Sequence, residues 1–127
     1  MNDLIQAARD ASRSAYCPYS NFHVGAAVRA GGRTFTGANV ENASYGLTVC
    51  AERTAAFAAI LAGAGRIEAV AVACVDAASG SDPALRMPCG ACRQVLAEFA
   101  DPATPIFVDG VGEFTLADLL PQAFRLR

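Results

Sequence analysis

The chain has 127 residues, of which 54% are hydrophobic and 17% are charged, and its formal net charge is −2. That length favours a single domain spanning residues 1–127 with one hydrophobic core. The apolar composition is typical of a chain that buries surface at subunit interfaces, or of one rich in alanine, which tolerates exposure. Every basic residue is arginine, and because the net charge is negative the chain lacks the basic surface that captures nucleic acid. We therefore expect no nucleic-acid partner.

Membrane and secretion signals are also missing from the sequence. The longest apolar stretches, such as residues 69–75, are too short to span a bilayer, and residues 1–16 carry charges of both signs, unlike a signal peptide. The five cysteines are an odd number, which does not fit a closed disulfide framework. We therefore expect reduced thiols, no membrane partner and a cytoplasmic location.

Hydrophobic periodicity and turn residues predict helices and strands along the whole chain. In chain order we expect a helix over 3–16, strands over 24–29 and 34–36, a helix over 49–61, a strand over 68–75, a helix over 88–99, strands over 106–109 and 113–115, and a helix over 115–120. The Gly31-Gly32 pair between the first two strands is typical of a tight hairpin turn. Thr115-x-x-Asp118 matches a capping box at the start of the last helix. No repeat or linker indicates a second domain.

Two cysteine motifs point to a metal site. Cys50 opens the predicted second helix, while Cys89 and Cys92 lie in the first turn of the third. A structural zinc site takes four protein ligands, whereas a catalytic site takes three and leaves one position to water, whose pKa falls from 15.7 to roughly 7. Both helix N-termini would favour thiolates at these positions. The sequence therefore predicts one catalytic Zn²⁺ per subunit, held by these three cysteines.

Glu52 is the candidate proton carrier of this site. It follows Cys50 by two residues, so on a helix it points away from the Cys50 direction yet stays within reach of water at the metal. A carboxylate in that place suits general acid/base catalysis. Cys with a Glu two residues later, followed by Pro-Cys-x-x-Cys, is the signature of zinc nucleobase deaminases.

Two other classes of protein share part of this pattern. A Cys-x-x-Cys pair also occurs in dithiol oxidoreductases and in structural zinc modules. A dithiol oxidoreductase using Cys89 and Cys92 would cycle a disulfide and bind no stoichiometric zinc. A structural zinc module would keep its metal and tolerate the loss of Glu52.

Further motifs give the chain a family resemblance, and they occur in the order Tyr16-Cys-Pro-Tyr-Ser20, Phe22-His-Val-Gly-Ala-Ala27, Asn39-Val-Glu-Asn42, Cys50-Ala-Glu-Arg53, Pro88-Cys-Gly-Ala-Cys-Arg-Gln94 and Leu119-Leu-Pro-Gln-Ala-Phe124. With these motifs the chain resembles the cytidine deaminases of pyrimidine salvage, in their small homotetrameric class. The resemblance implies a three-layer α/β/α fold with a five-stranded mixed sheet. It also implies hydrolytic deamination of cytidine and 2′-deoxycytidine to uridine and 2′-deoxyuridine, with release of ammonia.

The resemblance assigns residues to the nucleoside substrate. Phe22 would pack against the cytosine ring, and Asn39 and Glu41 would hydrogen-bond the ribose 3′-hydroxyl. Ala51 and Glu52 would contact the edge of the base. A related substrate, such as an aminonucleoside, a nucleotide or a base in nucleic acid, remains an alternative, although Glu41 near the sugar would repel an added phosphate.

The resemblance also implies residues that support the site. Tyr45 and Phe124 would complete the pockets of neighbouring subunits in the homotetramer. Zinc with three thiolates carries a net negative charge, and Arg53 would offset it by donating hydrogen bonds to ligand sulfurs, with Gln94 in a similar supporting part.

Three further residues of interest receive no such role. Cys74 lies in an apolar run and is expected to behave as a small buried hydrophobic residue, and neither it nor Cys17 is expected to bind metal. His23, the only histidine, follows Phe22 in an extended segment where successive side chains point to opposite faces. We therefore expect His23 to face solvent or an interface.

Overall fold

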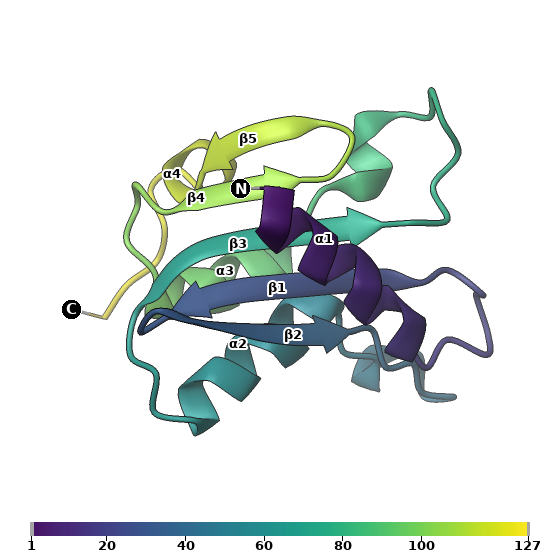
Figure 1. Cartoon of the computed structure of the whole chain (residues 1–127), viewed down its shortest axis with the longest axis horizontal. Helices are drawn as coiled ribbons and strands as arrows, with labels where there is room; N and C mark the ends of the chain where they lie inside the picture. The colour runs from purple at the N-terminus through teal and green to yellow at the C-terminus, as the bar shows by residue number, and fades with distance from the viewer. Residues whose placement is uncertain (1, 127) are drawn as a thin grey trace.

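The computed structural model describes residues 2–126 of the chain (Figure 1). The elements are α1 (Asn2–Ala11), β1 (Val24–Ala30), β2 (Arg33–Ala38), α2 (Ala51–Leu61), β3 (Ile67–Cys74), α3 (Gly90–Phe99), β4 (Pro105–Val108), β5 (Gly112–Thr115) and α4 (Leu116–Leu119). Three short 3-10 turns lie between them, η1 (Ser12–Ser14), η2 (Tyr45–Leu47) and η3 (Pro83–Arg86). Within residues 2–126, no helix has both the length and the apolar character needed to cross a bilayer.

The five strands form one mixed sheet in the order β2-β1-β3-β4-β5. Strand β1 pairs antiparallel with both β2 and β3, and β4 pairs antiparallel with β5. The central pair β3 and β4 is parallel, and α3 lies in the crossover between them. This topology confirms the predicted five-stranded mixed sheet.

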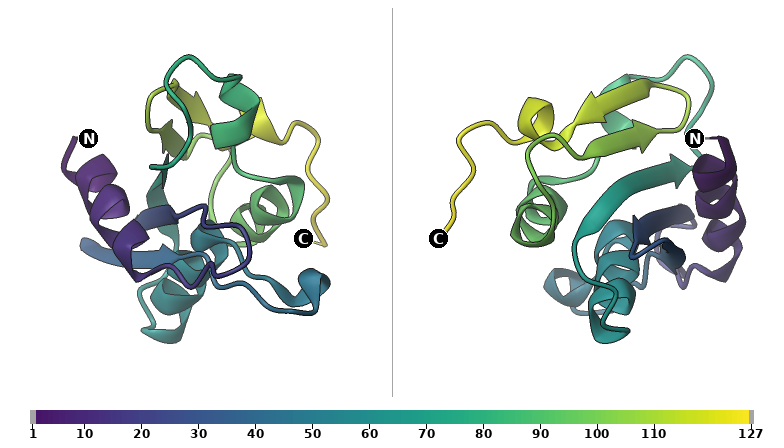
Figure 2. Two further views of the ribbon diagram at one scale, coloured as in Figure 1. Left: turned by 90° about the vertical axis from the view of Figure 1, so that its right-hand side faces the viewer. Right: turned by 60° about the vertical axis from the view of Figure 1, so that its left-hand side comes forward.

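Alternating side chains on the central strands divide the core into two layers. Along β3, Ala69, Ala71 and Ala73 pack against α1, whereas Val70 and Val72 face the core shared with α2 and α3. Successive residues of a strand point to opposite faces, so this alternation of small and branched side chains gives each face its own helix layer. Figure 2 shows α1 on one side of the sheet and α2 with α3 on the other, which confirms the predicted three-layer arrangement.

Helix boundaries are where the structure differs from the sequence prediction. Helix α1 ends at Ala11, five residues before the predicted end, and the chain tightens into η1. Helices α2 and α3 each begin two residues later than predicted, because Cys50 and Cys89 are N-caps with extended backbone. The predicted capping box of Thr115 and Asp118 is present at the start of α4.

Close approach of α2 to the sheet depends on a glycine in β2. A Cβ atom placed on Gly37 would lie 2.7 Å from the carbonyl oxygen of Ala51 and still closer to Thr54 Oγ1 and the Ala55 nitrogen. Since two of these three atoms belong to the backbone of the helix, they cannot move aside without shifting α2 itself. Gly37 therefore sets the position of the helix that carries Cys50 and Glu52.

Replacing Gly37 by alanine should destabilise the protein by about 1–3 kcal/mol, the usual cost of overpacking a well-packed site. Thermal unfolding at a fixed protein concentration measures the effect. Gly46→Ala is the matched control, because a Cβ atom at Gly46 meets nothing within 4 Å. Equal melting temperatures for the two variants would contradict this account of helix placement.

Candidate metal centre and active-site pocket

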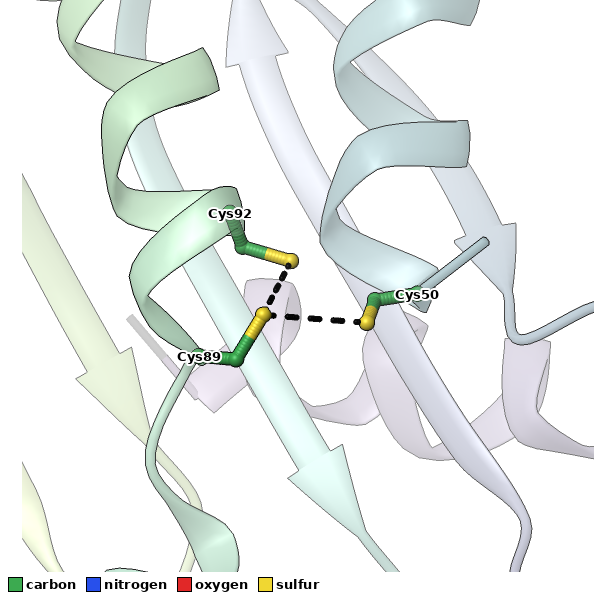
Figure 3. A group of neighbouring side chains, drawn as sticks. All are labelled: Cys50, Cys89 and Cys92. Carbon is green, nitrogen blue, oxygen red and sulfur yellow. Dashed lines mark hydrogen bonds between the residues drawn. The ribbon is translucent and has the colours of Figure 1, made fainter. Parts of the chain in front are cut away.

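Three cysteines converge where α2 and α3 begin. Cys50 is the N-cap of α2, Cys89 is the N-cap of α3, and Cys92 lies in the first turn of α3. The Cys89 sulfur lies 3.9 Å from that of Cys50 and 3.5 Å from that of Cys92. In Figure 3 the three side chains point toward a common centre from the two helices. The predicted ligand set is thus brought together across 39 residues of sequence.

The spacing of the three sulfurs fits a zinc ion. All three lie within 4.8 Å of one another. With zinc–sulfur bonds of about 2.3 Å, tetrahedral geometry places ligand sulfurs roughly 3.8 Å apart. Cys74 and Cys17 are free cysteines outside this group. The three thiols can therefore hold zinc in a tetrahedron with one position left open.

Positive charge around the cluster favours the thiolate form of Cys50. Neither α2 nor α3 has a side-chain hydrogen bond at its N-cap, so the N-terminal dipoles act directly on the cysteines there. Arg53 Nη2 donates to the Cys50 sulfur at 3.4 Å. A hydrogen bond from Cys92, with a further contribution from Arg53, lowers the pKa of Cys50 to about 5 against the effect of burial. Such a site attracts a cation to neutralise its thiolate.

Glu52 lies beside the thiols as an almost fully buried carboxyl group. It is in the first turn of α2, and 4% of its surface is exposed. Burial raises the pKa of Glu52 to about 7, and the nearby Cys50 thiolate also acts to raise it. A carboxyl group in this environment can accept a proton and return it near neutral pH.

A cavity of about 180 Å³ opens over Glu52 and two of the thiols. Six predicted residues line it, namely Phe22, Asn39, Cys50, Ala51, Glu52 and Cys89. The prediction missed five others, Val24, Val72, Cys74, Leu85 and Met87.

Some of these missed residues carried a usable signal in the sequence. Val24 and Cys74 pair across the ladder at the edge of the sheet where α2 and α3 begin, so their strand ends could have indicated them. Cys74 is half-buried there, and burial raises the pKa of its thiol to about 11. It is therefore a half-buried residue of the pocket, whereas the sequence predicted a small buried hydrophobic residue. Leu85 lies in η3, where no local pattern points to the pocket.

Asn39 and Glu41 hold the backbone of the segment that precedes β1. Asn39 Oδ1 accepts the N–H of Val24 at 2.9 Å, and Asn39 Nδ2 donates to the Phe22 carbonyl at 2.8 Å. The Glu41 carboxylate accepts the N–H groups of Tyr19 and Ser20 at 3.0 and 3.2 Å. Glu41 is not among the residues that line the cavity. Both side chains therefore hold the backbone of the segment that places Phe22 in the cavity wall.

The remaining predicted residues lie outside the cavity of their own chain. Tyr45 in η2 is 86% exposed and Phe124 near the C-terminus is 68% exposed. The side-chain amide of Gln94 donates to the Phe124 carbonyl at 3.1 Å, a contact that anchors the C-terminal segment. Support of the metal by Gln94 stays a prediction.

Comparison with known proteins gives matches over nearly the whole chain. A family model described as "Cytidine and deoxycytidylate deaminase zinc-binding region" matches residues 1–108. The cytidine deaminase of Halalkalibacterium halodurans is 47% identical over 126 residues, covering 95% of this chain and 91% of the relative.

Solved structures give the same result. The crystal structure of cytidine deaminase from Burkholderia pseudomallei has a TM-score of 0.85 at 45% identity, covering 97% of this chain and 98% of that one. The structure of cytidine deaminase from Mycobacterium tuberculosis has a TM-score of 0.84 at 44% identity, covering 98% and 97%. The region matched by the family model includes the three clustered cysteines and Glu52.

Replacing Cys89 by alanine should remove zinc from the protein and lower its melting temperature. Structural zinc contributes roughly 10–16 kcal/mol of apparent binding energy in small peptides, so losing one ligand costs stability as well as metal. Metal analysis and thermal unfolding of the purified variant measure both effects. Cys74→Ala should retain one zinc per chain, and a Cys89→Ala protein with full zinc and an unchanged melting temperature would refute the ligand assignment.

Proposed function

The chain belongs to the cytidine and deoxycytidylate deaminase family, and on that premise we propose that it hydrolyses cytidine and 2′-deoxycytidine to uridine and 2′-deoxyuridine. One ammonia leaves for each water consumed, in a step of pyrimidine salvage. The observation that carries this proposal is the convergence of a buried carboxyl group, three thiols and an aromatic wall on one small cavity. A structural zinc module needs neither a buried acid nor a cavity beside its cysteines, and a dithiol oxidoreductase using Cys89 and Cys92 needs no third cysteine.

Cys50, Cys89 and Cys92 are proposed as the three ligands of one zinc ion per subunit. When bound, zinc supplies Lewis-acid activation of a water molecule, lowering the pKa of that water to roughly 7. Arg53 keeps the cluster from accumulating uncompensated negative charge through its hydrogen bond to the Cys50 sulfur. Its Nε–H is buried without a hydrogen-bond partner among the residues the structure describes, which leaves a further donor at this end of α2.

Glu52 is proposed to carry the protons of the reaction. Its carboxylate takes a proton from the attacking water and delivers it to ring nitrogen N3 as the C4–O bond forms. It then transfers the remaining proton of that oxygen to the exocyclic amine, so that ammonia leaves and the C4 carbonyl of the product remains. The burial of Glu52 supports this role, because a carboxyl group shielded from solvent exchanges its proton with the substrate rather than with bulk water.

Phe22, Asn39, Glu41 and Ala51 are proposed as the substrate-binding residues. Phe22 and Ala51 line the cavity, where a flat aromatic base fits between apolar walls. Asn39 and Glu41 each have hydrogen-bonding capacity beyond the backbone contacts they already make, so both remain able to bind the ribose 3′-hydroxyl. Asn39 and Glu41, which hold the backbone around Phe22, would then also hold the ribose of the bound nucleoside.

We further propose that the protein is a homotetramer with active sites shared between subunits. The cavity of about 180 Å³ is smaller than the roughly 300–1,000 Å³ usual for small-molecule sites, so a single chain encloses the substrate incompletely. Tyr45 and Phe124 are exposed aromatic residues that can supply the missing walls of a neighbour's pocket.

The free cysteines support a cytoplasmic location for the protein. Residues 1–127 are proposed to form one domain.

Replacing Glu52 by glutamine should reduce the deamination rate by about 10⁴-fold or more, because loss of a general acid/base costs 10²–10⁴ and Glu52 moves several protons. Ammonia release and the ultraviolet change on conversion of cytidine measure the rate. Glu98→Gln is the matched control, because Glu98 is an exposed glutamate on α3, and it should leave the deamination rate unchanged.

Zinc content decides between the competing functions in this experiment. Equal zinc in the wild type and the Glu52→Gln protein, with turnover by the wild type alone, supports the deaminase. A wild type that holds zinc but does not release ammonia from cytidine rejects the proposal in favour of another substrate or a structural role. A wild type without zinc that forms a Cys89–Cys92 disulfide would be an oxidoreductase.

Light scattering of the wild type should give a molar mass of four chains. Coexpression of the Glu52→Gln chain with a Tyr45→Ala, Phe124→Ala chain should produce more activity than the sum of the two variants alone. Mixed tetramers contain sites in which an intact Glu52 meets intact aromatic residues from a neighbour. A fully active wild-type monomer, or mixed protein with no gain, would reject shared sites.

A further inference from the structure

Asp76 and His23 form a contact that links two walls of the cavity. Asp76 Oδ2 accepts the backbone N–H of His23 at 2.7 Å and lies 2.7 Å from His23 Nδ1. His23 directly precedes β1, and Asp76 lies two residues beyond the end of β3. The ladder between these strands ends at the pair Val24 and Cys74, so the Asp76 carboxylate binds the first backbone N–H beyond the ladder.

The contact between Asp76 and His23 fixes residues 20–23, which precede β1 and lie outside its ladders. The N–H of Phe22 donates to Ser20 Oγ at 3.0 Å, and its carbonyl accepts from Asn39 at 2.8 Å. Asn21 before it has a φ of 56°, a left-handed conformation that turns the chain into the cavity wall. The backbone N–H groups of Phe22, His23 and Val24 are thus each held by a side chain, and the position of Phe22 depends on those side chains.

Asp76 differs from the other side chains that hold this segment. Ser20 and Asn39 lie on the same side of the cavity as Phe22, in the turn before β1 and at the end of β2. Asp76 comes from the loop that follows β3, whose neighbours Cys74 and Leu85 line the cavity elsewhere. The carboxylate of Asp76 therefore ties the segment that carries Phe22 to the loop after β3, just beyond the Val24–Cys74 pair.

We propose that Asp76, oriented by His23, is a positioning residue that holds Phe22 in place for the substrate. This inference rests on the proposed function, because it assigns Phe22 to the base of a nucleoside. The pair thereby gives the single histidine, whose side chain is 40% exposed, a structural task beside the pocket. Asp76 makes both hydrogen bonds, so it contributes more to the positioning than the His23 ring does.

The local electrostatics agree with a role in positioning rather than in overall stability. The side chains of His23 and Asp76 are 40% and 41% exposed, and ion pairs with that exposure add little to the stability of a fold. The backbone N–H of His23 and then its ring hold the pKa of Asp76 below its usual value. The carboxylate therefore stays an acceptor throughout the neutral pH range, and its hydrogen bonds to His23 are kept.

Steady-state kinetics with cytidine test the proposal. Asp76→Ala should raise KM about tenfold and leave kcat within about twofold, because a displaced Phe22 weakens substrate and transition state alike. Asp76→Asn should recover most of the loss, since its amide oxygen still accepts the His23 N–H. His23→Ala should raise KM by only about two- to threefold, because it removes the ring contact and keeps the backbone bond.

Asp101→Ala serves as the matched control, because it removes an exposed carboxylate that pairs with Arg66. Arg66 directly precedes β3, at the end of the strand away from Asp76. It should leave KM unchanged, and zinc content should be equal in all variants. A KM for Asp76→Ala equal to that of the control would overturn the proposal. So would an equal loss in Asp76→Asn and Asp76→Ala, which would show that the carboxylate charge matters and the backbone bond does not.

Hydrogen exchange gives a second readout that does not depend on activity. The amides of residues 22–24 should exchange faster in Asp76→Ala than in wild type, while Asp101→Ala should match wild type. If wild type fails to deaminate cytidine, the proposed function fails, and exchange still decides whether Asp76 holds the segment. Unchanged exchange at residues 22–24 in Asp76→Ala would overturn the positioning role itself.

Discussion

The arrangement of the molecule depends on two helices that must begin at the same point. Cys50 and Cys89 are N-caps of α2 and α3, and together with Cys92 their sulfurs lie within 4.8 Å of one another. Thiolates at such separations repel unless positive charge surrounds them. That charge comes from the two helix N-termini and from Arg53, and the remainder falls to the metal. The cavity beside this cluster lies at the carboxyl end of β3, where Val72 and Cys74 line it.

The placement of α2 in turn depends on small residues where this helix packs against the sheet. Gly37 lets α2 approach β2 so closely that even a methyl group would meet the helix backbone. Ala55, Ala56 and Ala59 continue this close contact along the buried face of α2. The Ala-rich composition of the chain thus reflects tight packing between layers, in addition to any subunit interface. A helix held at that distance brings Glu52 into the cavity without exposing it to solvent.

The cavity wall opposite the metal centre is built in another way. Between residues 19 and 24, every backbone N–H except that of Asn21 bonds to a side chain, from Ser20, Asn39, Glu41 or Asp76. A wall held by side chains can differ in shape from a regular strand, and it can present an aromatic ring and polar groups side by side. Residues expected to bind the sugar therefore also support the ring beside it, so changes at Asn39 or Glu41 would affect binding in two ways.

The elements that could be predicted were those determined by local patterns. A short apolar run predicted β3, and a capping box predicted α4, because neighbours along the chain decide both. Helix boundaries were predicted less well, since an N-cap such as Cys50 has extended backbone that periodicity does not detect. The contact between His23 and Asp76 was not predicted, because the two residues lie 53 positions apart in sequence.

By itself the sequence determined the chemistry of this protein. The identity and spacing of Cys50, Glu52, Cys89 and Cys92 specify a metal site with an acid beside it, since each helix's first turn brings its own residues together. Only the tertiary structure decided what surrounds that chemistry, namely the cavity wall from η3, the backbone contacts of Asn39 and Glu41, and the link between Asp76 and His23. Those contacts join segments distant in the chain, and their partners are selected by the packing of the whole sheet rather than by any local pattern.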